Sequence, residues 1–213
     1  MRFTTLAALA MISLGATSHA VMFQADSAVA GSTYSSAYVI ENTIDGSGLP
    51  VGFVPTDAHA AYSSASGGNH WTTEANAINA EDAWAEFSFN ADVTMGTFYM
   101  WNHQSNGGLA SNPDYDVTLF NLILMDSSDN VLSAMNNLVG QEDITTAQVY
   151  AFGPVAGVRK VRFEILANAR PNNDSYTGLA EVAFDTQAVP EPATMTVLAG
   201  MAAAALARRR RKA

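Results

Sequence analysis

Apolar and polar residues alternate along short segments of the chain, and this alternation predicts β-strands. In residues 83–89 and again in residues 158–165, every second residue is apolar and most of those between are polar or charged. The buried face of the second segment would carry Val161, Phe163 and Ile165. A period of two is typical of a strand that has one face in the core and one in solvent. Both segments are therefore predicted to be half-buried strands.

Four further segments are predicted to be strands, at residues 96–101, 117–125, 148–152 and 178–184. Residues 127–130, of sequence SSDN, predict a hairpin turn before the next apolar pair. The connections are rich in Gly, Asn, Ser and Asp, and no helical period is sustained. Short strands at this spacing indicate an all-β fold, an antiparallel sandwich or jelly roll.

The two ends of the chain differ in pattern from this central part. A basic residue, Arg2, precedes an apolar run at residues 6–15, and small residues follow at 18–20. This order is typical of a cleaved secretory signal, and the apolar run is too short to span a bilayer. We therefore predict a signal peptide at residues 1–20 and a single exported domain at residues 21–188.

The domain at residues 21–188 is strongly acidic. It holds 19 acidic residues against 4 basic ones, so its formal charge is −15. Nucleic acid is excluded as a partner because nothing could replace the counterions of a phosphate backbone. Divalent cations or neutral ligands are compatible with this charge, although acidity also serves simply to keep an extracellular protein soluble.

Cysteine is absent, so the fold relies on its core and on any bound metal ion. Thiol catalysis and thiolate zinc sites are excluded for the same reason. Three of the domain's four basic residues, Arg159, Lys160 and Arg162, lie on or beside the strand at residues 158–165. They are predicted to decorate its solvent face rather than form a binding cluster.

Six short motifs follow one another in an order that resembles the discoidin, or coagulation-factor C-type, group of galactose-binding-like domains. They are ENTIDG at 41–46, HWTT at 70–73, WAEFSF at 84–89, FYMWN at 98–102, VRKVRF at 158–163 and GLAEV at 178–182. The resemblance covers about residues 26–186. It implies an eight-stranded jelly-roll sandwich whose loops at one end commonly hold sugars, lipids or proteins.

The same resemblance implies a structural calcium ion near the meeting point of the first and last strands. By position, Asp45 and Glu181 match the residues that usually supply ligands, and Asn42 is a further candidate. Calcium takes six to eight oxygen ligands, so a turning loop with carbonyls beside Asp45 and a carboxylate from a distant strand would suit it. The alternative is that Asp45 and Gly46 form a simple turn and Glu181 is a solvated edge residue.

No catalytic or zinc-binding motif is present, because His59, His70 and His103 occur in no metal-binding pair and there is no nucleophile elbow. Binding is therefore favoured over catalysis. A sugar site combines an aromatic platform with amides and a few charged donors. The candidate ligand-binding residues are Trp101, His103, Arg170, Asn172, Asn173 and Tyr176. Trp101 could instead pack in the core, and the two asparagines could instead form turns.

These observations leave two function classes open. The first is a carbohydrate or exopolysaccharide binding module, and the second is a structural matrix protein without a small ligand. A glycan-active enzyme is a more distant alternative, because it lacks a recognisable catalytic constellation. The long irregular region at residues 47–69 is predicted to be a loop that carries a site rather than a linker.

The C-terminal segment, residues 189–213, has three parts. The motif Val189, Pro190, Glu191, Pro192 precedes an uncharged stretch at 193–207 and a basic tail at 208–212. As a helix, the stretch would span about 23 Å, short of the ~30 Å hydrocarbon core, and the basic tail would stay cytoplasmic.

This order of parts resembles the PEP-CTERM sorting signal. The resemblance implies transient insertion in the inner membrane, cleavage by an exosortase, and delivery to the surface or extracellular matrix of a Gram-negative bacterium. The alternative is an ordinary C-terminal anchor.

Overall fold

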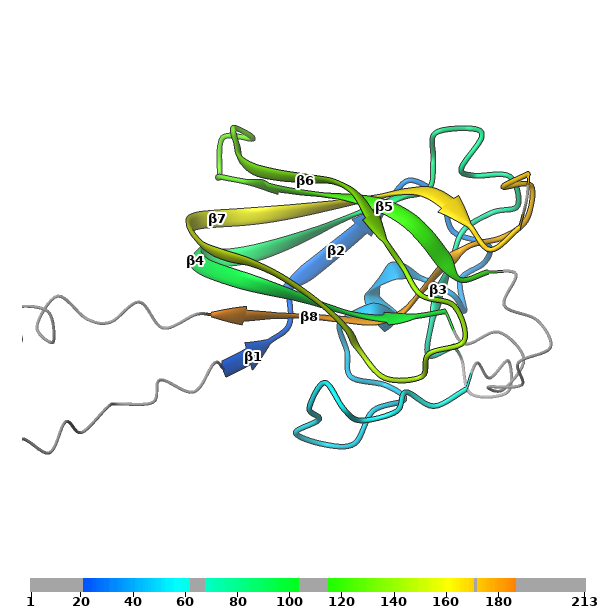
Figure 1. Cartoon of the computed structure of the whole chain (residues 1–213), viewed down its shortest axis with the longest axis horizontal. Coiled ribbons are helices and arrows are strands. Elements are labelled where there is room, and N and C mark those ends of the chain that lie inside the picture. Colours follow the sequence, from blue (N-terminus) through cyan, green and yellow to red (C-terminus); the bar gives the residue numbers. More distant parts are fainter. Residues whose placement is uncertain (1–20, 62–67, 104–114, 171, 187–213) are drawn as a thin grey trace, which may run out of the picture. The chain divides into compact units, whose positions relative to one another are not determined.

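The computed structural model describes residues 21–61, 68–103, 115–170 and 172–186, and their regular structure is almost entirely antiparallel β-strand (Figure 1). One 3₁₀ helix, η1 (Ile40–Thr43), follows the first two strands. The strands are β1 (Val21–Phe23), β2 (Ser27–Ala30), β3 (Trp71–Thr72), β4 (Trp84–Asn102), β5 (Val117–Met125), β6 (Val131–Val139), β7 (Gln148–Asn168) and β8 (Gly178–Thr186). The predicted all-β class is confirmed.

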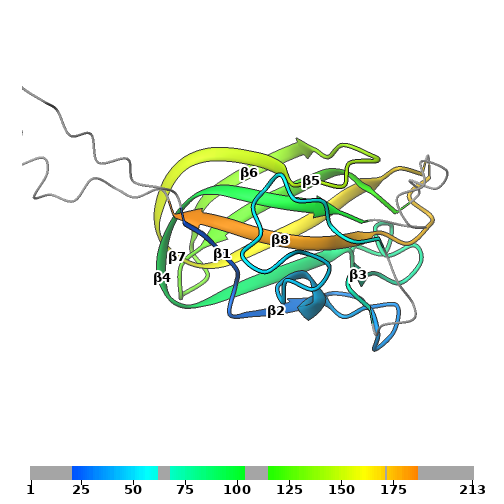
Figure 2. The same ribbon diagram turned by 90° about the horizontal axis from the view of Figure 1, so that it is seen from below.

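The strands form one hydrogen-bonded path that folds over into two layers (Figures 1 and 2). Its order is β1-β8-β4-β7-β5-β6, with β2 added beside β4 and β3 beside β8. Residues 84–88 of β4 pair with residues 160–164 of β7, whereas residues 97–102 of β4 pair with β8. Register shifts between Ser88 and Thr97 mark the bend that carries β4 from one layer to the other. This is the predicted jelly-roll sandwich.

Aromatic side chains fill the space between the layers. The fully buried rings are Phe87 and Phe98 of β4, Phe120 of β5, Phe163 of β7 and Phe184 of β8. Phe120 and Phe163 lie 4.7 Å apart between ring centroids, and Phe98 lies 5.8 Å from Phe163. Burial of each ring contributes about 1.5–3 kcal/mol, so this cluster holds the two layers together.

The outer face of β7 carries the predicted row of charges. Each basic residue there forms an ion pair: Arg159 with Asp92 at 3.8 Å, Lys160 with Asp129 at 2.6 Å and Arg162 with Glu164 at 3.0 Å. These three side chains are half-buried, and their charges are paired along the outer face of β7.

The predicted hairpin connects β5 to β6. Asp126 begins the turn, and its Oδ1 accepts hydrogen bonds from the backbone amides of Ser128 and Asn130, at 2.8 and 3.0 Å. Asp129 has a φ of 63°, the left-handed conformation that Asp and Asn tolerate best among residues with a side chain. The turn chemistry read from the sequence is thus the chemistry that closes the hairpin.

The predicted signal peptide at residues 1–20 and the sorting segment at residues 189–213 lie outside the described residues. Of the loop at residues 47–69, residues 62–67 also lie outside. In the part of the chain that the structure describes, no helix is long and apolar enough to cross a membrane.

Candidate functional site

Three tyrosines from distant segments meet at one end of the sandwich. Tyr34 follows β2, Tyr115 precedes β5 and Tyr176 precedes β8. The ring centroids of Tyr34 and Tyr176 lie 5.0 Å apart and those of Tyr115 and Tyr176 lie 5.4 Å apart, both edge to face. Tyr34 is 52% exposed, so this tyrosine cluster presents aromatic surface to solvent. Figure 2 shows the loops of this end far from the end at which β1 starts and β8 stops.

The loop between β7 and β8 supplies polar groups beside the tyrosine cluster. Arg170 and Asn172 are exposed, and Tyr176 lies at the end of the same loop. Asn173 adopts a φ of 53°, and its Oδ1 accepts a hydrogen bond from the backbone amide of Asn168 at 3.1 Å. The side chain of Asn173 therefore shapes the loop, whereas Arg170 and Asn172 are exposed in it.

Trp101 is buried, whereas its candidate role in ligand binding requires an exposed ring. Its side chain is fully buried, its Nε1 donates to the carbonyl oxygen of Asp57 at 2.9 Å, and its ring packs edge to face on Phe53 at 5.5 Å. A sugar can stack only on a ring face that solvent reaches. As placed here, Trp101 packs against the loop at residues 47–61 and offers no platform, which is the core-packing alternative.

His103 is likewise buried, as part of a stack of three histidines. The ring centroids of His59 and His70 lie 4.9 Å apart, and so do those of His70 and His103. Tyr115 lies next, 5.4 Å from His103. His103 therefore supports the tyrosine cluster from the protein interior and does not itself reach a ligand in solvent. The Nε2 of His103 and the Oγ1 of Thr72 form a hydrogen bond of 2.9 Å.

Burial keeps all three histidines neutral. Loss of solvation lowers the pKa of His59, lowers that of His70 well below its usual value, and lowers that of His103 to about 3. Their mutual proximity lowers the pKa values of His70 and His103 further. Among the described residues, no group of three or more His, Cys, Asp or Glu side chains is arranged to hold a metal ion.

The predicted calcium ligands Asp45 and Glu181 lie near each other. Glu181 is fully buried on β8, and its Oε1 accepts a hydrogen bond from Gln24 Nε2 at 2.6 Å. Burial raises the pKa of Glu181 to about 9, and the nearby Asp45 carboxylate raises it further. The backbone amide of Gly46 bonds to the same carboxyl. The simple alternative of a solvated edge residue is therefore wrong for Glu181.

An unsatisfied oxygen tests whether a cation fits this place. The Oε2 of Glu181 is buried and has no hydrogen-bond partner in the described part of the chain, and the same holds for the Oγ of Ser47. Buried oxygens without donors are rare and costly. Carboxylate, hydroxyl and carbonyl oxygens, the donor types that Asp45, Glu181, Ser47 and their loop contain, are the ligands that calcium prefers. The residues present fit the ion.

Asn42, the third predicted ligand, has a separate structural role. Its Nδ2 donates to the carbonyl oxygens of Ala37 and His70, at 3.0 and 2.9 Å. These two bonds tie η1 to the loop before β3, and they direct the amide toward His70. Asp45 is placed differently, since its Oδ1 accepts the amide of Ser47 at 2.7 Å in a tight turn.

Tyr34 and Tyr115 were not among the sequence-predicted site residues. Each lies in a polar loop, and 80 residues separate them. Only the pairing of β2 with β4 and of β5 with β7 brings these loops to one end. The available signal was an aromatic residue in a segment rich in Gly and Ser, at residues 31–36.

Comparison with known proteins identifies the C-terminal segment and the fold. Residues 188–212 match the PEP-CTERM protein-sorting motif. No curated protein matches the chain. Solved structures with the same fold include a fucose binding module from Streptococcus pneumoniae, with a TM-score of 0.51 at 17% identity, covering 76% of this chain and 91% of that one.

Two further structures agree. An F5/8 type C domain from Bacteroides fragilis aligns with a TM-score of 0.52 at 17% identity, over 79% of this chain and 98% of that one. A family 32 carbohydrate-binding module from C. perfringens, in complex with galactose, aligns with a TM-score of 0.50 at 11% identity, over 78% and 99%. The chain thus combines a β-sandwich that has the fold of these solved structures with a C-terminal segment that matches the PEP-CTERM protein-sorting motif.

Proposed function

We propose that the protein is an exported carbohydrate-binding module that meets an extracellular polysaccharide through its tyrosine cluster. The observation that carries this proposal is the solvent-facing cluster of Tyr34, Tyr115 and Tyr176, built from three separate loops. A pyranose ring has an apolar face that packs on aromatic rings and a rim of hydroxyls that needs hydrogen bonds. Arg170 and Asn172, both exposed beside the cluster, supply such groups.

Charge favours the same class of ligand. The domain at residues 21–188 carries a formal charge of −15, so polyanions are repelled while neutral glycans are not. The ligands named for two of the solved structures described above, fucose and galactose, are neutral sugars. We expect binding without turnover, because the sequence contains no recognisable catalytic motif.

The experiment is polysaccharide affinity electrophoresis and a glycan array with the purified protein. Tyr34→Ala and Arg170→Ala are each expected to weaken binding about tenfold, since a stacked ring or a charged hydrogen bond contributes ~1.5 kcal/mol. Arg159→Ala is the matched control, because this half-buried arginine of β7 pairs with Asp92 and lies outside the tyrosine cluster. If the intact protein binds no glycan, the protein is a structural matrix component instead.

We also propose that one calcium ion joins the loop at Asp45 to β8. Asp45, Glu181 and loop oxygens near Ser47 would hold it, and the ion would supply positive charge to a carboxyl that burial otherwise keeps protonated. Because the domain has no disulfide, such an ion would fix its first loop to its last strand. Its role is structural and it takes no part in ligand recognition.

For the C-terminal segment, we propose exosortase processing. The match at residues 188–212 implies that an exosortase recognises the segment. We propose in addition that residues 193–207 insert transiently in the inner membrane of a Gram-negative bacterium and that the domain is then released to the cell surface or matrix. The basic residues at 208–212 would hold the end of the chain on the cytoplasmic side.

A further inference from the structure

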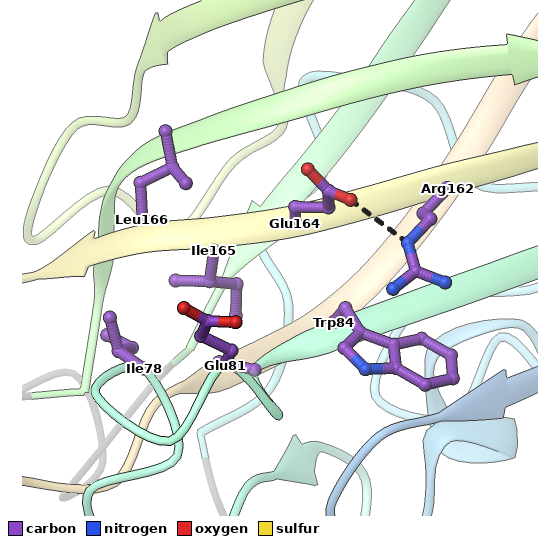
Figure 3. Close-up of a pocket in the computed structure, with 8 residues that line it drawn as sticks. Ile78, Glu81, Trp84, Arg162, Glu164, Ile165 and Leu166 are labelled. Carbon is purple, nitrogen blue, oxygen red and sulfur yellow. Dashed lines mark hydrogen bonds and ion pairs between the residues drawn. The ribbon is translucent and has the colours of Figure 1, made fainter. Parts of the chain in front are cut away.

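An open cleft, separate from the tyrosine cluster, lies on the outer side of the sandwich, where β4 and β7 pair (Figure 3). Its volume is about 400 Å³, within the range of about 300–1,000 Å³ that small-molecule sites occupy. It shares no residue with the tyrosine cluster. The lining residues are Ile78, Glu81, Ala83, Trp84, Arg162, Glu164, Ile165 and Leu166.

Arg162 is held rigidly on one side of this cleft. Its guanidinium carbon lies 4.1 Å from the ring centroid of Trp84, and its Nε donates to Glu164 Oε1 at 3.0 Å. Gly31 supports the indole from behind, since a Cβ built at Gly31 would lie 2.4 Å from Trp84 Nε1. Stacking and the Nε bond fix the guanidinium plane, so the two terminal NH₂ groups of Arg162 are positioned donors.

Those NH₂ groups have no hydrogen-bond partner among the residues that the structure describes. The second oxygen of Glu164 accepts a hydrogen bond from Asn121 Nδ2 at 3.3 Å, which orients this carboxylate as well. Figure 3 shows Arg162 and Glu164 side by side along β7, above Trp84. One side of the cleft thus offers donors and an acceptor that neighbouring residues hold in place.

Glu81 brings a second acceptor from the opposite side. It adopts a φ of 61°, which is uncommon for a residue with a long side chain, and its backbone amide donates to the Ile78 carbonyl at 3.1 Å. Its carboxylate makes no hydrogen bond or ion pair within the described residues. Figure 3 shows that carboxylate turned toward Ile165, and strained backbone of this kind concentrates at functional sites.

We infer that this cleft is a second carbohydrate subsite, which takes a hexopyranose unit without a carboxylate. A vicinal diol needs donors and acceptors together, and Arg162 and Glu81 supply both across an apolar wall of Ile78, Ile165 and Leu166 on which a sugar's CH face would pack. Two carboxylates against one guanidinium leave a net charge of −1, which disfavours acidic sugars. The inference rests on the proposed function and adds a site that it does not contain.

Tryptophan indole signals in ¹⁵N NMR spectra separate this subsite from the tyrosine cluster. The chain has three tryptophans, and only Trp84 is partly exposed, because Trp71 and Trp101 are fully buried. The Nε1 of Trp71 donates to the carbonyl of Ser32, two residues before Tyr34. The Trp71 signal thus reports on the tyrosine cluster, and the Trp84 signal reports on the cleft.

The protein is titrated with neutral gluco-, galacto-, manno- and xylo-oligosaccharides and with oligogalacturonate. We expect a neutral oligosaccharide to shift the Trp84 signal saturably and oligogalacturonate to leave it unchanged. If glycans bind on the array but no oligosaccharide shifts the Trp84 signal, the second subsite is refuted while the proposed function stands. If no glycan binds at all, both fail.

Variants test whether the two sites are independent. Glu81→Asn retains a residue that tolerates positive φ but removes the carboxylate, and Arg162→Lys removes the planar donors. In each variant, the dissociation constant obtained from the Trp84 signal is expected to rise at least fivefold. The melting temperature and the response of the Trp71 signal should stay unchanged. The double variant Tyr34→Ala, Arg170→Ala should preserve the Trp84 response. Loss of the Trp84 response in that double variant, or its persistence in both cleft variants, would overturn the inference.

Discussion

Single buried ionisable residues make this domain sensitive to pH. His59, His70 and His103 form a stack without water access, and burial lowers the pKa of each. A histidine that is neutral in the fold at a pH where the unfolded chain would protonate it lowers stability as the pH falls. The histidine stack is therefore compatible with a stable fold at neutral pH, and it lowers the free energy of unfolding in acid.

We expect His103→Gln to reduce the loss of stability between pH 7 and pH 5 by about 2 kcal/mol. The unfolded chain takes up a proton below pH 6.5, whereas burial holds the pKa of His103 in the fold to about 3. Each pH unit below 6.5 therefore costs about 1.4 kcal/mol in the wild type. Gln can retain the hydrogen bond to Thr72. Urea unfolding of both proteins at the two pH values measures the difference.

The comparison with the wild type is essential, because Asp116 acts in the opposite sense. Burial raises its pKa to about 7, so between pH 3.8 and 7 the fold gains stability as the pH falls. That contribution is common to both proteins and cancels in the difference. An equal pH dependence for wild type and His103→Gln would show that His103 is solvated.

A calcium ion bound by Glu181 is expected to stabilise the domain against unfolding. At a hundredfold excess over its dissociation constant, the ion should raise the free energy of unfolding by about 2.7 kcal/mol. Glu181→Gln should abolish this gain. In chelator at pH 8, the variant should be at least as stable as the wild type, because a buried carboxyl whose pKa is raised to about 9 by burial costs stability as the pH rises above its unfolded pKa.

Thermal unfolding with and without calcium measures both effects. Asp116→Asn is the matched control, since it removes another buried carboxyl with a raised pKa and should leave the calcium effect unchanged. If Glu181→Gln keeps the full calcium effect, the ion binds elsewhere or not at all.

At the scale of elements, the bent strands β4 and β7 decide the architecture. Each contributes to both layers, and register shifts in β4 and glycines with positive φ in β7, Gly153 and Gly157, mark the bends. The pairing of the short strand β3 with β8 depends on a different glycine. At Gly178, an added Cβ would lie 1.9 Å from the Trp71 carbonyl oxygen, so only glycine allows this approach.

We therefore expect Gly178→Ala to destabilise the domain by at least ~2 kcal/mol, because β3 must move away from β8. Gly153→Ala is the control. No atom lies within 4 Å of its added Cβ, so its positive φ alone should cost about 1 kcal/mol. Denaturant unfolding separates the two, and a smaller effect for Gly178→Ala than for Gly153→Ala would contradict the close packing.

The accuracy of the sequence predictions followed the burial of the elements. Strand β5, buried and straight, has the predicted bounds of residues 117–125. Strand β4 was read as two strands, because the bend at residues 89–95 interrupts its alternation. Strand β6 lies at an edge with most side chains exposed, and it was visible only through the turn before it. The short strands β1, β2 and β3 have too few residues to show a period.

Site residues were harder to predict than strands, since burial decides their role. Trp101 and His103 have suitable chemistry, but a strand end can point an aromatic ring inward as readily as outward. Tyr34 and Tyr115 give no local signal, because topology alone makes them neighbours. Glu181 could be inferred only through the family resemblance, and its buried, unsatisfied oxygen is information that a sequence does not contain.

At the scale of the whole molecule, the β-sandwich domain and the sorting segment differ in charge. The described residues between 21 and 186 belong to one compact unit, which contains the tyrosine cluster and the cleft. The acidic domain contrasts with the basic residues at 208–212, which suit the cytoplasmic face of a membrane. In the proposed function, the sorting segment serves delivery and the β-sandwich domain serves ligand recognition.

We therefore expect the mature exported protein to end near residues 190–192, and intact mass spectrometry of surface material measures this end. Changing both prolines, Pro190→Ala with Pro192→Ala, should leave the uncleaved chain in the membrane fraction, because the exosortase no longer recognises its motif. Tyr34→Ala is the matched control, since it should weaken glycan binding but leave processing intact. A mature protein from the wild-type chain that still contains residues 193–212 would contradict exosortase processing and would favour an ordinary C-terminal anchor.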